Sequence, residues 1–182
     1  IVTLLREVWV VFSLLRTEQT ELQELSIHTA AEFGDVEELK RLLKAKPADV
    51  DLRSADGNGY TPLISAAVCG KLEAVKFLVE QKATVDKTSR NGSAALHFAC
   101  SNGFAEIAAF LLDGGASIDR RNEDEDTSLI LAVVKDELRC VKLLLERKAD
   151  TTPKSTNGVF NKGKTALDIA KAKKFGDIVA VL

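Results

Sequence analysis

The chain of 182 residues carries 25 Lys and Arg against 27 Asp and Glu, a formal net charge of −2, so no strong positive field points to a nucleic-acid partner. Hydrophobic residues make up 46% and aromatic residues only 5%, a balance that favours thin helical layers over one wide core. The three cysteines have neither disulfide nor zinc-ligand spacing, which predicts a reducing compartment, the cytoplasm or the nucleus.

Residues 1–24 form the first predicted element, an amphipathic helix. Apolar residues at three- and four-residue spacing, among them Leu4 and Val8, would share one face. Arg6 and Glu7 interrupt the apolar run, so we expect neither a secretory signal nor a membrane span. Two structural roles remain open for this segment, a cap on the following helices or a degenerate repeat. The alternative is a functional role, in which its apolar face binds a partner or a membrane surface.

Short helices alternate with glycines after this segment. Between Asn91 and Asp119, a first helix ends at Gly103, and a second helix with an apolar stripe ends at Gly115. Both glycines stand where a chain commonly needs a positive φ. Neither helix could bury its stripe alone, so each pair requires neighbours. The predicted pairs are 61–69 with 71–81, 94–102 with 104–113, and 127–134 with 137–147.

The same pattern returns every 33 residues. A fixed period between 20 and 50 residues is typical of stacked-repeat proteins. Three sets of equivalent positions show the period: Gly59, Gly92 and Glu125; Leu63, Leu96 and Leu129; and Ala66, Ala99 and Ala132.

Three segments carry a family resemblance: Gly-Tyr-Thr-Pro-Leu at 59–63, Leu-His-Phe-Ala at 96–99 and Phe-Leu-Leu-Asp-Gly-Gly-Ala at 110–116. With the period, they resemble the ankyrin repeat over the stretch 25–182. The resemblance implies an all-α solenoid of helix pairs with β-hairpin fingers, in which each pair contacts only its neighbours. The repeats would lie near 25–55, 56–88, 89–121, 122–154 and 160–182.

Individual repeats depart from this pattern. Ala94 replaces the threonine that precedes the equivalent helices, so this N-cap is either lost or moved to Ser93. Lys82 and Lys148 stand where the third repeat has Gly115. If these positions are left-handed, each lysine costs on the order of 1 kcal/mol relative to glycine.

Two features invite an enzymatic interpretation. The segment 158–165 matches the phosphate-binding loop G-x-x-x-x-G-K-[ST], but polar residues and Pro153 precede it instead of a buried strand, so nucleotide binding is a remote alternative. His28 and His97 share one repeat position, to which the resemblance assigns a structural hydrogen bond to the neighbouring loop. No nucleophile stands beside either histidine. We therefore expect no enzyme, no catalytic residue, no cofactor and no metal.

The resemblance implies a partner-binding concave face, built from the first helix of each repeat and the fingers. Apolar residues should form a line along it, and Ile169 belongs either to this line or to the interior of the stack. The finger at 122–126 carries four consecutive acids, which form either a solvated surface or a site for a basic segment. The predicted partner-binding residues are Phe33, Tyr60, Val68, Arg90, Phe98, Asn102, Glu123, Asp124, Asp126, Leu131 and Val134.

The sequence therefore predicts a non-enzymatic interaction scaffold. Its partner would be another protein or a peptide segment with basic and bulky apolar residues, with no role for nucleic acid or, in this hypothesis, for a membrane. The leading alternative makes the helix at 1–24 the functional element. The partner's identity and the oligomeric state stay open.

Overall fold

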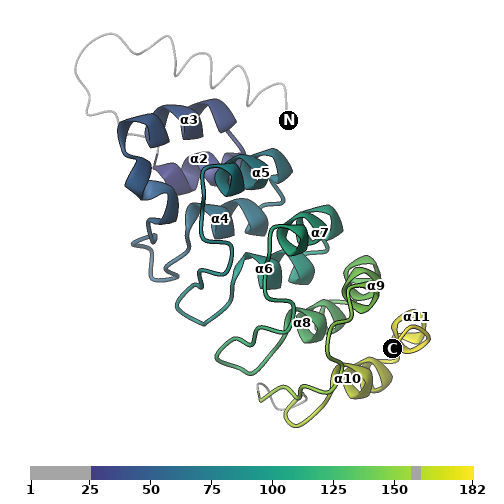
Figure 1. The fold of residues 1–182 in the computed structure, drawn as a ribbon. Helices are drawn as coiled ribbons and strands as arrows, with labels where there is room; N and C mark the ends of the chain where they lie inside the picture. The colour runs from purple at the N-terminus through teal and green to yellow at the C-terminus, as the bar shows by residue number, and fades with distance from the viewer. Residues whose placement is uncertain (1–25, 157–160) are drawn as a thin grey trace, which may run out of the picture.

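Two rows of helices make up the computed structural model, which describes residues 26–156 and 161–182 (Figure 1). The predicted helix at 1–24 lies outside these residues and stays a prediction, as do the boundaries of the repeats. The inner row holds α2 (Ile27–Phe33), α4 (Pro62–Val68), α6 (Ala95–Ser101), α8 (Ser128–Val134) and α10 (Ala166–Lys173). The outer row holds α3 (Val36–Ala45), α5 (Leu72–Glu80), α7 (Ala105–Asp113), α9 (Leu138–Glu146) and α11 (Gly176–Val179). A short 3-10 helix, η1 (Pro47–Asp51), follows α3.

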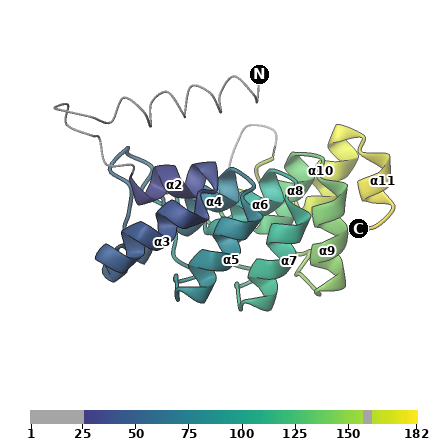
Figure 2. The same cartoon turned by 90° about the horizontal axis from the view of Figure 1, so that it is seen from above.

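The helices stack in chain order, one pair beside the next. Each inner helix packs on the inner helices before and after it and on its own outer helix, and the outer helices follow the same order (Figure 2). The bounds of the three predicted helix pairs differ from the observed ones by at most one residue. Contacts between neighbours are the arrangement expected of a stacked repeat, because each layer buries the apolar stripe of the next.

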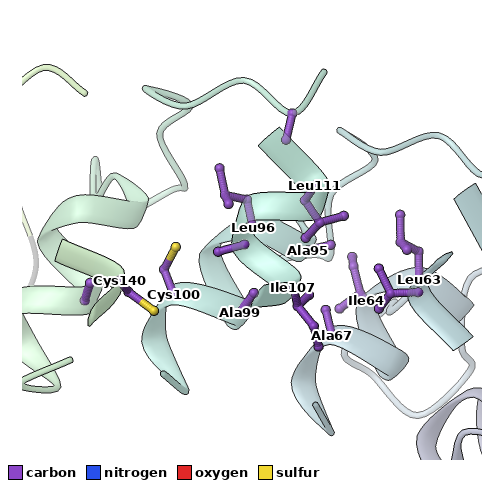
Figure 3. Close-up of a cluster of buried hydrophobic side chains, with 14 of the residues drawn as sticks. Leu63, Ile64, Ala67, Ala95, Leu96, Ala99, Cys100, Ile107, Leu111 and Cys140 are labelled. Atoms are coloured by element: carbon purple, nitrogen blue, oxygen red, sulfur yellow. The ribbon is translucent and has the colours of Figure 1, made fainter. Parts of the chain in front are cut away.

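Small side chains line the contacts between inner helices, and large side chains pack under the outer helices. Ala66, Ala99 and Ala132 of the inner row are fully buried, and their small size allows neighbouring helices to approach closely. Leucines at a matching period fill the space beneath the outer row: Leu78, Leu111 and Leu144. Figure 3 shows such side chains from successive repeats in one cluster that extends to Cys100 and Cys140. The periodic sequence thus produces one continuous core.

The fingers between the repeats are loops. Within 26–156 and 161–182, β-pairing is limited to one isolated bridge between Lys154 and Thr165, so the predicted β-hairpins are not confirmed. Two backbone bonds close the finger at 89–93, from the Ser89 amide to the Ser93 carbonyl (2.9 Å) and from the Gly92 amide to the Ser89 carbonyl (3.2 Å). No ladder of paired strands extends from this turn within 26–156 and 161–182.

Three local details expected from the sequence can be compared with the structure, and for the N-cap of α6 the structure selects the loss of the side-chain cap. Lys82 and Lys148 are left-handed, with φ of 68° and 63°. His97 is structural, since its Nε2 bonds the Arg120 carbonyl oxygen (3.0 Å). The N-cap of α6 has not moved to Ser93, because the Ala94 amide donates instead to Nδ1 of His97 (3.1 Å). With Nδ1 accepting, the proton of the neutral ring lies on Nε2.

Candidate functional site

Several apolar side chains of the inner row are incompletely buried. We call their surface the inner face and define it by the exposed sides of α2, α4, α6 and α8 together with the fingers at 53–60, 89–93 and 122–126 (Figure 1). On α6, Leu96, His97, Ala99 and Cys100 are buried, which leaves Phe98 and Ser101 on the opposite side. Equivalent positions on the other inner helices differ: Leu131 keeps exposed surface as Phe98 does, whereas Ser65 is buried.

Apolar residues occupy several outward positions on the inner row. Phe33 at the end of α2 is 72% exposed, the largest value among the bulky apolar side chains of the described residues. Val68, Leu131 and Val134 are half-buried and continue the line across α4 and α8. Half-buried apolar side chains retain surface that a partner could remove from water. Each Å² of apolar surface covered in this way stabilises a complex by roughly 25 cal/mol.

An aromatic pair forms the middle of this line. The rings of Tyr60 and Phe98 meet edge to face, with centroids 5.1 Å apart and planes at 66°. Partial burial raises the pKa of Tyr60 above its ordinary value, and the charge of Asp56 raises it further. The phenol therefore stays neutral at physiological pH and can offer a hydrogen bond to a ligand.

The apolar line does not reach Ile169, which the sequence left open as its last member. Ile169 of α10 is fully buried and belongs to the core of the stack, where Ile178 of α11 is also fully buried. Position 169 therefore belongs to the interior, and the line ends at Val134.

Asn102 is exposed at the end of α6, as predicted for a surface residue. Its amide nitrogen donates to the carbonyl oxygen of Val68 at the end of α4 (3.0 Å). The side chain thus joins two repeats across the inner face. A partner that used this amide as a donor would have to replace that bond.

The acidic finger is less uniformly exposed than its sequence suggests. Glu123 is exposed and Asp124 is half-buried, whereas Asp126 is only 6% exposed. The amide oxygen of Asn122 accepts bonds from the backbone amides of Asp124 (3.0 Å) and Asp126 (2.9 Å), which curls the loop and turns residue 126 inward. The side chain of Asp126 therefore lies beneath the finger, and its predicted contact with a partner stays a prediction.

Burial changes the chemistry of Asp126. Removal from water raises the pKa of this carboxyl group, the nearby charge of Asp124 raises it further, and a hydrogen bond from Ser155 opposes the rise. One carboxylate oxygen, Oδ1, has no partner among the described residues. Three successive fingers carry a polar residue at the period of the repeat that is buried in the structure: Ser89, Asn122 and Ser155. This periodic polar position is the sequence signal for the environment.

The remaining charges of the fingers fall into two groups. Arg121 and Glu125 form an ion pair (2.7 Å), which neutralises both on the third finger. Arg90 and Glu123 are exposed and form no ion pair with any residue of 26–156 or 161–182. These two side chains therefore present one unpaired positive and one unpaired negative charge to a partner.

In the segment that matches the phosphate-binding loop, the described residues form structural hydrogen bonds. The Gly163 amide donates to the Ser155 carbonyl (2.8 Å), and the Thr165 hydroxyl caps α10 by accepting the Asp168 amide (3.3 Å). Residues 158–160 lie outside the described residues. Across the described parts of the chain, no group of three or more His, Cys, Asp or Glu side chains could hold a metal ion. No helix in those parts is both long and apolar enough to cross a membrane.

Comparison with known proteins agrees with this architecture. A family model described as ankyrin repeats, in three copies, matches residues 9–91, 27–122 and 82–155. The chain belongs to the ankyrin-repeat family. Its inner and outer rows are therefore the two helices of successive ankyrin repeats, and its inner face is built from first helices and fingers.

Several curated proteins are similar to parts of the chain. Mouse protein phosphatase 1 regulatory subunit 27 is 36% identical over 93 residues, which cover 51% of this chain and 59% of the relative. Mouse ankyrin repeat and SAM domain-containing protein 6 is 34% identical over 127 residues, 68% of this chain and 14% of the relative. The mask protein of Drosophila melanogaster, an ankyrin repeat and KH domain-containing protein, is 38% identical over 103 residues, 56% of this chain and 3% of the relative. The chain thus spans little more than half of the first relative's length and a small part of the others.

Proposed function

We propose that the chain is a non-enzymatic scaffold that binds a segment of another protein on its inner face. The observation that carries this proposal is the line of incompletely buried apolar side chains that runs from Phe33 to Val134. A contiguous apolar surface flanked by polar fingers is more often an interaction site than an accident of folding. A reducing compartment suits the proposal, since Cys69, Cys100 and Cys140 are free thiols.

The relatives support a binding role of this kind. One of them is named as a regulatory subunit of a phosphatase, and a regulatory subunit acts through another protein. The similarity covers 51% of this chain, so it supports the class of function and leaves the partner's identity open.

The centre of the proposed site is the aromatic pair of Tyr60 and Phe98 with Leu131 beside it on the next inner helix. Binding energy in protein interfaces is concentrated in a few buried aromatic or apolar anchors, whose truncation typically costs ~2 kcal/mol or more. Phe98 and Leu131 are the side chains best placed to pack against such an anchor.

The test uses peptides selected from a displayed library of random 15-residue sequences on the immobilised chain. Peptides that bind the wild type should bind a Phe98→Ala, Leu131→Ala double variant at least tenfold more weakly. Lys142→Ala is the matched control, since Lys142 is exposed on α9 of the outer row and should not affect binding. Circular dichroism must show that the double variant is folded. Equal affinity of the folded double variant, or a loss confined to the Lys142 control, would contradict the proposal.

A further inference from the structure

Arg90 and Glu123 occupy the same place on successive fingers. The backbone amide of Arg90 donates to the carbonyl oxygen of Asn58 (2.9 Å), and that of Glu123 donates to the carbonyl oxygen of Asn91 (3.0 Å). In both cases the acceptor lies 32 residues earlier, on the preceding finger. The same bond recurs from Thr156 to Asp124 (2.9 Å), so the register is a property of the array. Two opposite charges therefore stand at equivalent positions, one repeat apart.

Neither charge is satisfied within the described parts of the chain. Both side chains are exposed, and neither forms an ion pair or a side-chain hydrogen bond with a residue of 26–156 or 161–182. The neighbouring Arg121 and Glu125 on the third finger do pair, at 2.7 Å, which shows that ion pairs form on these loops where the geometry allows. Arg90 and Glu123 lie on different fingers and form no such pair.

The spacing of the repeats sets the spacing of the groups that these charges would bind. Neighbouring packed helices lie about 8–10 Å apart, and the fingers follow the inner helices at that interval. An extended segment advances about 3.3 Å per residue. A segment that runs along the inner face therefore passes from one finger to the next in about three residues.

The apolar line lies directly behind the two fingers. The finger with Arg90 leads into α6, which carries Phe98, and the finger with Glu123 leads into α8, which carries Leu131. A bulky apolar side chain of the segment could reach these residues while its charged neighbours meet the fingers. A uniformly basic segment would gain at Glu123 but would be repelled at Arg90.

We propose that the inner face selects an extended protein segment with one acidic and one basic side chain about three residues apart, next to a bulky apolar residue. The acidic group pairs with Arg90 and the basic group pairs with Glu123. This inference rests on the proposed function and specifies the chemistry of the partner.

The test repeats the random 15-residue peptide selection on three full-length proteins: wild type, Arg90→Glu and Lys142→Glu. Among peptides whose binding requires Phe98, the wild type should enrich acid–base pairs at separations of two to four residues at least threefold over the unselected library. Arg90→Glu should replace this preference by pairs of basic residues at the same separation. Lys142→Glu, a reversal of the same charge on the outer row, should enrich the wild-type pattern.

Two results would overturn the inference while leaving the proposed function intact. One is a set of Phe98-dependent peptides with no preferred separation between acidic and basic residues. The other is an unchanged preference in Arg90→Glu. If no selected peptide depended on Phe98 or Leu131, the proposed function itself would fail, and this inference with it.

Discussion

Replacement of Lys148 by glycine should raise the free energy of unfolding by about 0.5–1 kcal/mol. The lysine is held at φ 63°, where a residue with a Cβ carries strain of roughly 1–2 kcal/mol. Glycine removes this strain. The unfolded chain has greater conformational freedom at a glycine, however, and this lowers stability by about 0.5–1 kcal/mol. The Lys148 side chain is exposed and makes no ion pair with the described residues, so no contact offsets the gain.

The third repeat provides the reciprocal experiment. Gly115, at the equivalent position, has φ 89°, and a Cβ added there would meet no atom within 4 Å. Gly115→Lys should therefore destabilise the protein through backbone conformation alone, by a similar amount. Lys82→Gly lies 66 residues from Lys148 in the second repeat, and distant substitutions are normally additive. The double glycine variant should gain about 1–2 kcal/mol.

Urea denaturation followed by circular dichroism measures these differences, and a gain of 1 kcal/mol corresponds to roughly 2–4 °C in melting temperature for a domain of this size. Lys148→Gln separates charge from conformation, because it removes the ammonium group and keeps the strained backbone. It should leave stability unchanged. If the glutamine variant gained as much as Lys148→Gly, or if the glycine variant were no more stable than the wild type, backbone strain would not explain the difference.

Two further predictions concern buried polar groups. His97→Leu should lower stability at pH 8 by about 1–3 kcal/mol for each group left unsatisfied, the Ala94 amide and the Arg120 carbonyl. Burial lowers the pKa of His97, so the neutral ring stabilises the fold above the unfolded value of about 6.5 and this contribution is lost as pH falls below it. Urea titrations at pH 8 and 5.5 should therefore show a weaker pH dependence in the variant, and equal slopes would contradict this account. The pKa of Asp126 is raised, so its ionisation destabilises the fold increasingly as pH rises above the unfolded value of about 3.9. Asp126→Asn should therefore have a larger free energy of unfolding than the wild type at pH 7. This difference should shrink toward pH 4.

Much of the fold follows from local sequence. The helices of the second, third and fourth repeats begin and end within one residue of their predicted bounds, because apolar spacing and helix ends depend on residues three or four positions apart. The left-handed positions of Lys82 and Lys148 were also predictable, since a fixed period transfers the conformation of Gly115 to its equivalents. The structural role of His97 followed from the family resemblance in the same way.

The candidate site was predictable only in part. Phe33 and Phe98 keep exposed surface where the repeat pattern places outward positions, because helix geometry determines which side faces away from the core. Glu123 and Asp126 both belong to the same acidic run, yet one is exposed and the other is buried. Composition alone could not separate them.

The tertiary structure decided what depends on contacts between repeats. Asp126 turns inward because Asn122 curls the finger and Ser155 of the following finger binds the carboxylate, and the second of these interactions lies outside any local pattern. Ile169 is fully buried, whereas Phe98 and Leu131 at the equivalent positions keep exposed surface. Arg90 and Glu123 occupy equivalent places because backbone bonds hold successive fingers in register. A periodic sequence determines the repeating unit through short-range interactions, whereas the exposure of each side chain depends on which neighbouring repeat covers it.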